Sequence, residues 1–110
     1  MDNTDVVRAC FEAYLTQDRD RAESIIAPGF TFTSPQDDHI DRAAYFERCF
    51  PTAHRLRSQR ILQAVPGEGD DVFVMYEYER LDGATHRNTE LITVRDGQIV
   101  DVQVFFGGRY

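Results

Sequence analysis

Residues 88–108 read NTELITVRDGQIVDVQVFFGG, two strands joined by one turn, and this hairpin decides the fold. Alternate residues of a strand share a face, so the second strand is expected to have two different faces. One face is apolar and carries Val100, Val102, Val104 and Phe106. The other carries Ile99, Asp101, Gln103 and Phe105. The segment Arg95-Asp96-Gly97 suits a three-residue hairpin loop with Gly97 in the left-handed conformation.

This register places Glu90 opposite Val102, on the apolar face of the hairpin. Burying an ionised carboxylate costs free energy unless the group is paired, hydrogen-bonded or protonated. The sequence therefore predicts a polar cavity or a partner for Glu90 inside the fold. Two roles stay open: a general acid or base with a raised pKa, or a structural carboxylate tied to Arg60, Arg87 or a tyrosine hydroxyl.

Size and charge exclude several classes of function. The 110 residues suffice for one domain, residues 1–110, without a separate cofactor domain. The formal net charge of −7 argues against a nucleic-acid partner. All 12 basic residues are arginines, so lysine Schiff-base chemistry, lysine-anchored pyridoxal phosphate and a Walker-type phosphate loop are excluded. We predict no cofactor.

The sequence also predicts a protein without membrane segments. No apolar run approaches the length of a membrane span, and residues 1–5 lack the features of a secretory signal, so we expect a cytoplasmic location. Cys10 and Cys49 are then expected to be free thiols. The three histidines, His39, His54 and His86, show no metal-ligand spacing, and we predict no metal site.

The order of the predicted elements indicates the fold class. Helices are predicted at 4–16, capped by Thr4 or Asn3, at about 19–27, and after an N-cap at Asp41. A short strand is expected at 30–34, followed by a loop at 36–39. Four strands follow at about 55–65, 71–81, 84–95 and 98–106, with turns marked by glycine. Helices first and sheet after predict an α+β fold: a curved antiparallel sheet around three N-terminal helices.

The register of the strand before the last hairpin is ambiguous. A three-residue loop at Leu81-Asp82-Gly83 places Glu77 opposite Arg87 on the outer face, with Tyr76 on the inner face near Glu90. A two-residue loop would place Glu77 and Glu79 beside Glu90 instead. Because three carboxylates crowded on an inner face are costly, we prefer the longer loop.

The whole pattern resembles the SnoaL-like branch of the nuclear transport factor 2-like superfamily, which also includes ketosteroid isomerases and scytalone dehydratases. The resemblance lies in YLTQDRD at 14–20, FTFTSPQDDHIDRAAYFERCFP at 30–51 and the terminal hairpin. It covers nearly the whole chain. It implies a cone-shaped α+β fold with a pocket between the helices and the concave face of the sheet. It also implies dimers formed through the outer face of the sheet.

The resemblance does not carry over the catalytic triad of the ketosteroid isomerases. Laid on that pattern, the oxyanion-donating tyrosine falls on Cys10, the general-base aspartate on Ser34 and the protonated aspartic acid on Glu90. Cys10 is a poor hydrogen-bond donor, and Ser34 is not basic near neutral pH without an adjacent base. The sequence therefore disfavours steroid isomerisation by that triad.

Candidate site residues follow from these faces and loops. Glu90 is the main candidate for catalysis, with Asp38 or His54 as its partner. Which of Asp37, Asp38, His54 and His86 reaches the pocket stays open, because loop carboxylates and surface histidines commonly have no catalytic role. The predicted pocket lining is Tyr14, Phe32, Ser34, Tyr45, Phe46, Cys49, Tyr76, Asn88, Val102, Val104 and Phe106.

Two functions from different classes remain. The first is a proton-transfer enzyme, an isomerase, cyclase or dehydratase, that acts on a small apolar, carbonyl-bearing substrate. The second is a noncatalytic ligand-binding or dimerisation module. An open cavity with an unpaired Glu90 favours the enzyme, and a packed interior favours the module. Apolar residues expected on the outer sheet face, Phe73, Met75, Leu91 and Phe105, predict a homodimer.

Overall fold

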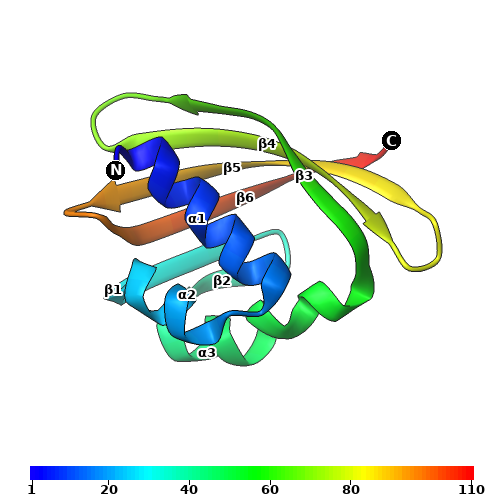
Figure 1. Cartoon of the computed structure of the whole chain (residues 1–110), viewed down its shortest axis with the longest axis horizontal. Helices are drawn as coiled ribbons and strands as arrows, with labels where there is room; N and C mark the ends of the chain where they lie inside the picture. Colours follow the sequence, from blue (N-terminus) through cyan, green and yellow to red (C-terminus); the bar gives the residue numbers. More distant parts are fainter.

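The computed structural model describes all 110 residues. The helices are α1 (Asn3–Thr16), α2 (Arg19–Ile25), α3 (Arg42–Arg48) and the 3-10 helix η1 (Phe50–Arg55). The strands are β1 (Ile26–Ser34), β2 (Asp37–Asp41), β3 (Leu56–Pro66), β4 (Asp71–Arg80), β5 (Thr85–Arg95) and β6 (Gln98–Arg109). Helix α1 crosses β3–β6, and α2 and α3 lie beside β1 and β2 (Figure 1). The α+β class predicted from the sequence is confirmed.

One six-stranded sheet has the order β2-β1-β6-β5-β4-β3. All neighbouring pairs are antiparallel except β1 and β6, which are parallel. The sheet is therefore mixed, whereas the sequence predicted an antiparallel sheet. The connection between β1 and β6 contains α3 and four strands, long enough for the chain to re-enter in the same direction. Residues 37–41, predicted largely as a loop, form β2 by pairing with β1.

The three α-helices begin at acidic capping residues. Asp41 caps α3, as predicted, by accepting a hydrogen bond from the backbone N–H of Ala44 at 2.9 Å. The predicted cap of α1 is wrong, because Asp2 rather than Asn3 or Thr4 occupies that position and forms a reciprocal capping box with Asp5. No helix is long and apolar enough to cross a membrane.

The β5–β6 hairpin differs from its predicted register. Arg95 pairs with Gln98, so the loop has two residues rather than three, and Asp96 and Gly97 both have positive φ angles of 53° and 76°. Such loops match the twist of the flanking strands. The shorter loop shifts the register by one residue and an extra residue in β6, Val100, shifts it by another, so Glu90 pairs with Val104 instead of Val102. A shift of two residues leaves it on the predicted apolar face.

A bulge close to this turn corrects the predicted faces of β6. Val94 pairs with Ile99 while Thr93 pairs with Asp101, which leaves Val100 as the extra residue. The bulge reverses the alternation, so Ile99 points inward and is 1% exposed. The inner face of β6 is therefore formed by Ile99, Val102, Val104 and Phe106.

The β4–β5 hairpin has the preferred register. Glu77 pairs with Arg87, and Tyr76 pairs with Asn88. On the outer face, Glu77 forms ion pairs with Arg60 and Arg87, at N–O distances of 3.2 and 3.0 Å. The pairing keeps Glu77 away from Glu90, as the charge argument predicted.

The hydrophobic core fills only one end of the cone. Its side chains come from α1, α2, α3, β1 and the inner faces of β4–β6, and Val7, Val72, Val74 and Val94 are completely buried. Further along β4 and β5 the buried residues become polar, at Tyr76 and Asn88. The core therefore stops near the middle of the sheet.

Gly107→Ala should destabilise the fold, because a Cβ atom at this position in β6 would collide with the carbonyl oxygen of Arg87. We expect a loss of about 1–2 kcal/mol in the free energy of unfolding, measured by urea denaturation. Gly29→Ala is the matched control, because a Cβ atom there meets nothing within 4 Å. Equal stability of the two variants would contradict the close approach of β5 to Gly107.

Candidate functional site

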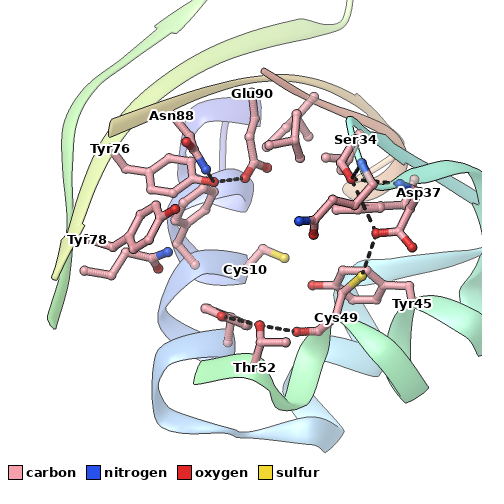
Figure 2. Close-up of a pocket in the computed structure, with 18 of the residues that line it drawn as sticks. Cys10, Ser34, Asp37, Tyr45, Cys49, Thr52, Tyr76, Tyr78, Asn88 and Glu90 are labelled. Carbon is pink, nitrogen blue, oxygen red and sulfur yellow. Dashed lines mark hydrogen bonds between the residues drawn. The ribbon is translucent and has the colours of Figure 1, made fainter. Parts of the chain in front are cut away.

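Beyond the core lies a half-open cavity of about 500 Å³. It is bounded by α1, by α3 with η1, and by the concave face of the sheet. Of its 27 lining residues, 16 are hydrophobic, so the walls are mixed rather than uniformly apolar. Figure 2 shows Glu90 and Cys10 pointing into the open centre, with Tyr76 and Tyr78 on one side and Asp37 on the other. Its size suits a small organic ligand.

Glu90 projects from β5 into this cavity and is held by a short chain of hydrogen bonds (Figure 2). The hydroxyl of Tyr76 donates to Oε2 of Glu90 at 2.6 Å, and Nδ2 of Asn88 donates to the Tyr76 oxygen at 3.2 Å. A tyrosine hydroxyl has one hydrogen, so Tyr76 must accept from Asn88 when it donates to Glu90. The chain of donors therefore runs in one direction.

No cation pairs with Glu90. Arg60 and Arg87, the predicted partners of a structural carboxylate, both lie on the outer face and pair with Glu77. Of the predicted ties, the structure shows only the tyrosine hydroxyl, that of Tyr76. The Glu90 carboxylate is thus enclosed by the protein without a positive charge to compensate for its lost contact with water.

This environment sets the acidity of Glu90. Burial raises its pKa from 4.5 to about 7, against the opposing effect of the hydrogen bond from Tyr76. Burial, with the nearby Glu90, also raises the pKa of Tyr76 far above its ordinary value, so its hydroxyl stays protonated. A carboxyl group with a pKa near 7 can both accept and donate a proton at neutral pH.

Tyr76→Phe should raise the pKa of Glu90 above about 7, because it removes the hydrogen bond that favours the ionised form. The titration can be followed by ¹³C NMR of the labelled Glu90 carboxyl carbon. Tyr14→Phe is the matched control, since that hydroxyl bonds to Thr52 at 2.7 Å and not to Glu90. An unchanged or lower pKa in Tyr76→Phe would show that the Tyr76 bond does not hold the carboxylate.

A second carboxylate, Asp37, lies on the opposite wall. The hydroxyl of Ser34 donates to Oδ2 of Asp37 at 3.3 Å and accepts the backbone N–H groups of Gln36 and Asp37, each at 3.1 Å. Nη1 of Arg48 lies 3.8 Å from Oδ1 of Asp37, and the thiol of Cys49 lies 4.0 Å from Oδ2. Asp37 is thereby fixed at the edge of the cavity.

The floor of the cavity carries hydroxyl groups and thiols. The hydroxyl of Thr52 donates to the carbonyl of Cys49 at 2.7 Å, so Tyr14 donates to Thr52. Both cysteines are free, as predicted. Burial raises the pKa of Cys10 to about 12 and that of Cys49 to about 11, so both thiols are neutral and weakly nucleophilic at pH 7.

Most of the predicted lining residues meet at the cavity together with Glu90. They are Tyr14, Phe32, Ser34, Tyr45, Cys49, Tyr76, Asn88, Val102, Val104 and Phe106. Of the four groups left open, Asp37 and His86 reach the cavity. No three His, Cys, Asp or Glu side chains lie close enough together to hold a metal ion.

Three predicted site residues lie elsewhere. The side chain of Asp38 is 93% exposed and pairs with His39, because β2 alternates and turns Asp37 inward instead. His54 lies on the surface, where its ring bonds to the carbonyl of Pro51 within η1. Phe46 is buried in the core beneath the guanidinium groups of Arg19 and Arg42.

Several lining residues were not identified from the sequence. They include Cys10, Phe11, Arg48, Thr52, Arg55, Gln59, Tyr78 and Arg80. Tyr78 and Arg80 follow Tyr76 at two-residue spacing, so the alternation of β4 could have found them. Asp37 also had a signal, because Pro35-Gln36 is a turn across which Ser34 and Asp37 pair. Arg55 and Thr52 lie on η1, which has no comparable periodicity.

Comparison with known proteins places this geometry in a family. The model of the SnoaL-like domain matches residues 7–102. Among solved structures, the chain is similar to a protein from Kribbella flavida DSM 17836, at 27% identity over 93% of this chain and 84% of that chain, with a TM-score of 0.81. No curated protein matches the sequence.

Two further structures show the fold alone, because their identity is lower. A protein from Xanthomonas campestris with a cystatin-like fold has 21% identity over 99% of this chain and 93% of that chain, with a TM-score of 0.83. A proposed polyketide cyclase from Sinorhizobium meliloti has 19% identity over 92% and 94%, with a TM-score of 0.79. The family match extends from α1 through Glu90 to Val102, and the chain belongs to the SnoaL-like domain family.

Proposed function

We propose that this protein transfers protons on a small carbonyl-bearing molecule held in the cavity, with Glu90 as the acid–base group. The observation that carries this proposal is the state of Glu90, a carboxyl group inside an open cavity, with a pKa of about 7 and no cationic partner. Only Oε2 is hydrogen-bonded within the protein, which leaves Oε1 for a ligand. Oε1 is not a buried atom, so it is open to the cavity.

The chemistry that fits this arrangement begins next to a carbonyl group. Glu90 in its ionised form removes a proton from the carbon beside the carbonyl and, once neutral, returns it to another position. Isomerisation, aldol-type ring closure and dehydration can all begin with this step. A polyketide cyclase, as proposed for the Sinorhizobium meliloti protein of the same fold, would use such a step. Asp37 replaces Asp38 and His54 as the candidate second group, because it is the other carboxylate at the cavity.

The noncatalytic module is the weaker candidate. A packed interior or a Glu90 neutralised by an arginine would favour it, and the cone instead has a cavity of about 500 Å³ with both predicted arginine partners outside it. A purely structural carboxyl group would also gain nothing from a pKa close to the pH of the cell.

Deuterium exchange tests the proposed step without knowledge of the natural substrate. The protein is incubated in D₂O with a panel of enolisable aromatic and cyclic ketones, and loss of the proton beside the carbonyl is followed by ¹H NMR. Exchange faster than in buffer, at one carbon of one compound class, supports the proposal. Exchange no faster than in buffer across ketones that demonstrably bind in the cavity contradicts it.

We also propose that the chain forms a homodimer through the outer face of the sheet. Phe73 and Phe105 are 44% and 53% exposed, and they lie with Met75 and Leu91 on the same side of β4–β6. We expect a dimer in sedimentation velocity at micromolar concentration and a monomer for Phe73→Glu/Phe105→Glu. Leu81→Glu, at an exposed residue of the β4–β5 turn, should remain dimeric. A monomeric wild-type protein would contradict this assembly.

A further inference from the structure

We propose that the mouth of the cavity binds an anionic group of the ligand, of the carboxylate class, through Arg55 and Arg80. This inference rests on the proposed function, because it assumes that a small molecule occupies the cavity. The inference adds to the proposed function that the ligand carries an acidic group at the end remote from its reacting carbonyl. The observations that support it are the order of residues along the sheet, the unpaired state of two guanidinium groups and one buried nitrogen without a partner.

The inner face of β4 changes in character along its length. Val72 and Val74 are completely buried in the core, and Tyr76 is 5% exposed beside Glu90. Tyr78 follows at the cavity wall, and Arg80 is exposed where the strand ends. The β4–β5 hairpin extends beyond α1, so this end of the concave face is not covered by that helix (Figure 1). A ligand lying along β4 would thus reach Arg80 at the cavity mouth.

Arg55 lies beside Arg80 although the two are distant in sequence. The backbone N–H of Leu81 donates to the carbonyl of Arg55 at 3.1 Å, and Leu56 pairs with Arg80 across β3 and β4. The positive charge of Arg55 also affects a residue of the cavity. Burial raises the pKa of Tyr14, and the charge of Arg55 opposes that rise. Two arginines from separate elements therefore line the same end of the cavity.

Neither of these guanidinium groups has a partner in the protein. Arg55 and Arg80 form no ion pair and no side-chain hydrogen bond. By contrast, Arg48 lies 3.8 Å from Asp37 at the same cavity, and Arg57 lies 4.0 Å from Glu79 outside it. In a chain of net charge −7, two unpaired arginines at one opening leave a local positive site. Arginine binds carboxylates with paired, parallel hydrogen bonds.

His86 supplies a further unsatisfied group at this end. It lines the cavity on β5 and stacks on Tyr78, with ring centroids 5.3 Å apart and an interplanar angle of 13°. Its Nδ1 atom is buried and has no hydrogen-bond partner. A buried polar atom without a partner costs free energy that a ligand atom could recover. When Nδ1 carries a hydrogen, it lacks an acceptor, and a carboxylate of the ligand would supply one.

The spacing of these groups constrains the shape of the ligand. Val74 pairs with Glu90, and Arg80 lies six residues further along the same strand, about 20 Å at 3.3 Å per residue. The long side chains of Glu90 and Arg80 shorten this span. The carboxylate and the reacting carbonyl are therefore at opposite ends of an elongated, mainly apolar molecule.

Two probes of the same shape test this inference. 2-Naphthoate carries a carboxylate, and 2-naphthamide replaces it by a neutral amide of similar size. Binding is measured by ¹⁵N NMR at pH 6 and low salt, where Glu90, with a pKa of about 7, is mostly neutral. We expect shifts at Tyr78 and His86 and a Kd for naphthoate at least about tenfold below that for naphthamide. In 0.5 M NaCl this preference should largely disappear.

The variant Arg55→Gln/Arg80→Gln should reduce the preference to within about twofold. The matched control is Arg57→Gln/Arg60→Gln, which removes the same charge from residues that do not line the cavity. Equal binding of both probes to the wild-type protein, or a preference that survives the first variant, would overturn the inference and leave the proposed function standing. If neither probe shifts any cavity resonance, the small-molecule site itself is wrong and both proposals fail. The salt series keeps the test valid if the double variant does not fold.

Discussion

Glu90→Gln is expected to lower the rate of proton transfer by about 10²–10⁴-fold, the usual contribution of a general acid–base group. Glutamine keeps the size of the side chain, and its carbonyl oxygen can still accept the hydrogen bond from Tyr76. It cannot take up or release a proton. The ligand should therefore still bind while kcat collapses, which can be measured with whichever ketone shows exchange in D₂O.

Glu77→Gln is the matched control for this experiment. Both substitutions replace a glutamate on neighbouring strands by its neutral isostere, but Glu77 lies on the outer face between Arg60 and Arg87. Its exchange rate should stay within about twofold of the wild type, because rim and surface charges contribute little to a buried site. Full activity in Glu90→Gln would mean that another group, with Asp37 the first candidate, carries the proton.

The second large effect concerns stability rather than activity. Glu90→Gln should be more stable than the wild-type protein by about 2–3 kcal/mol at pH 8, with no gain at pH 4. For a domain of this size the gain corresponds to a rise of about 10 °C in Tm. Thermal or urea denaturation of both proteins between pH 4 and pH 8 measures the difference.

The sign follows from the raised pKa of Glu90, from 4.5 to about 7. Below pH 4.5 the carboxyl group is protonated in both the folded and the unfolded chain, so it costs nothing. Between the two values the unfolded chain releases its proton while the folded chain keeps it, and stability falls as the pH rises. Above pH 7 the folded protein carries the cost of a partly buried charge. Glutamine has no such cost at any pH.

Glu77→Gln should change stability in the opposite direction. The hydrogen bond from Arg87 and the contacts with Arg60 lower the pKa of Glu77, so its ionised form is stabilised in the folded protein. The variant should lose stability above the ordinary pKa of 4.5 and approach the wild type as the pH falls through the lowered value. If the wild-type protein and Glu90→Gln were equally stable at every pH, water in the cavity would solvate the Glu90 carboxylate fully.

The face on which Glu90 lies was predictable from the sequence, although its cross-strand neighbour was not. Strand alternation depends only on residue parity, so the two-residue error in the β5–β6 register left Glu90 inside. The bulge at Val100 was not predictable, because it depends on fitting the two-residue loop at Asp96-Gly97 to the core contacts of Ile99. Local alternation thus gave the face of Glu90, whereas long-range packing set the register and the face of Ile99.

The candidate site was predictable where it lies on strands and less so where it lies on loops. Tyr76 and Asn88 follow from alternation, and both contact the network of Glu90. Asp37 and Asp38 are neighbours in the sequence, and which of them faces the cavity depends on the pairing of β2 with β1. The sequence predicted a loop for most of β2. The proximity of Arg55 and Arg80 requires the pairing of β3 with β4 where η1 ends, which no local pattern contains.

The one-way hydrogen-bond chain from Asn88 through Tyr76 to Glu90 has a stereochemical consequence. Because Tyr76 occupies Oε2, a mobile proton resides on Oε1 whenever Glu90 is neutral. In the proposed reaction this one atom would both collect and deliver the proton, from a single side of the bound molecule. We therefore expect the migration to be suprafacial and a chiral centre created by it to have one handedness.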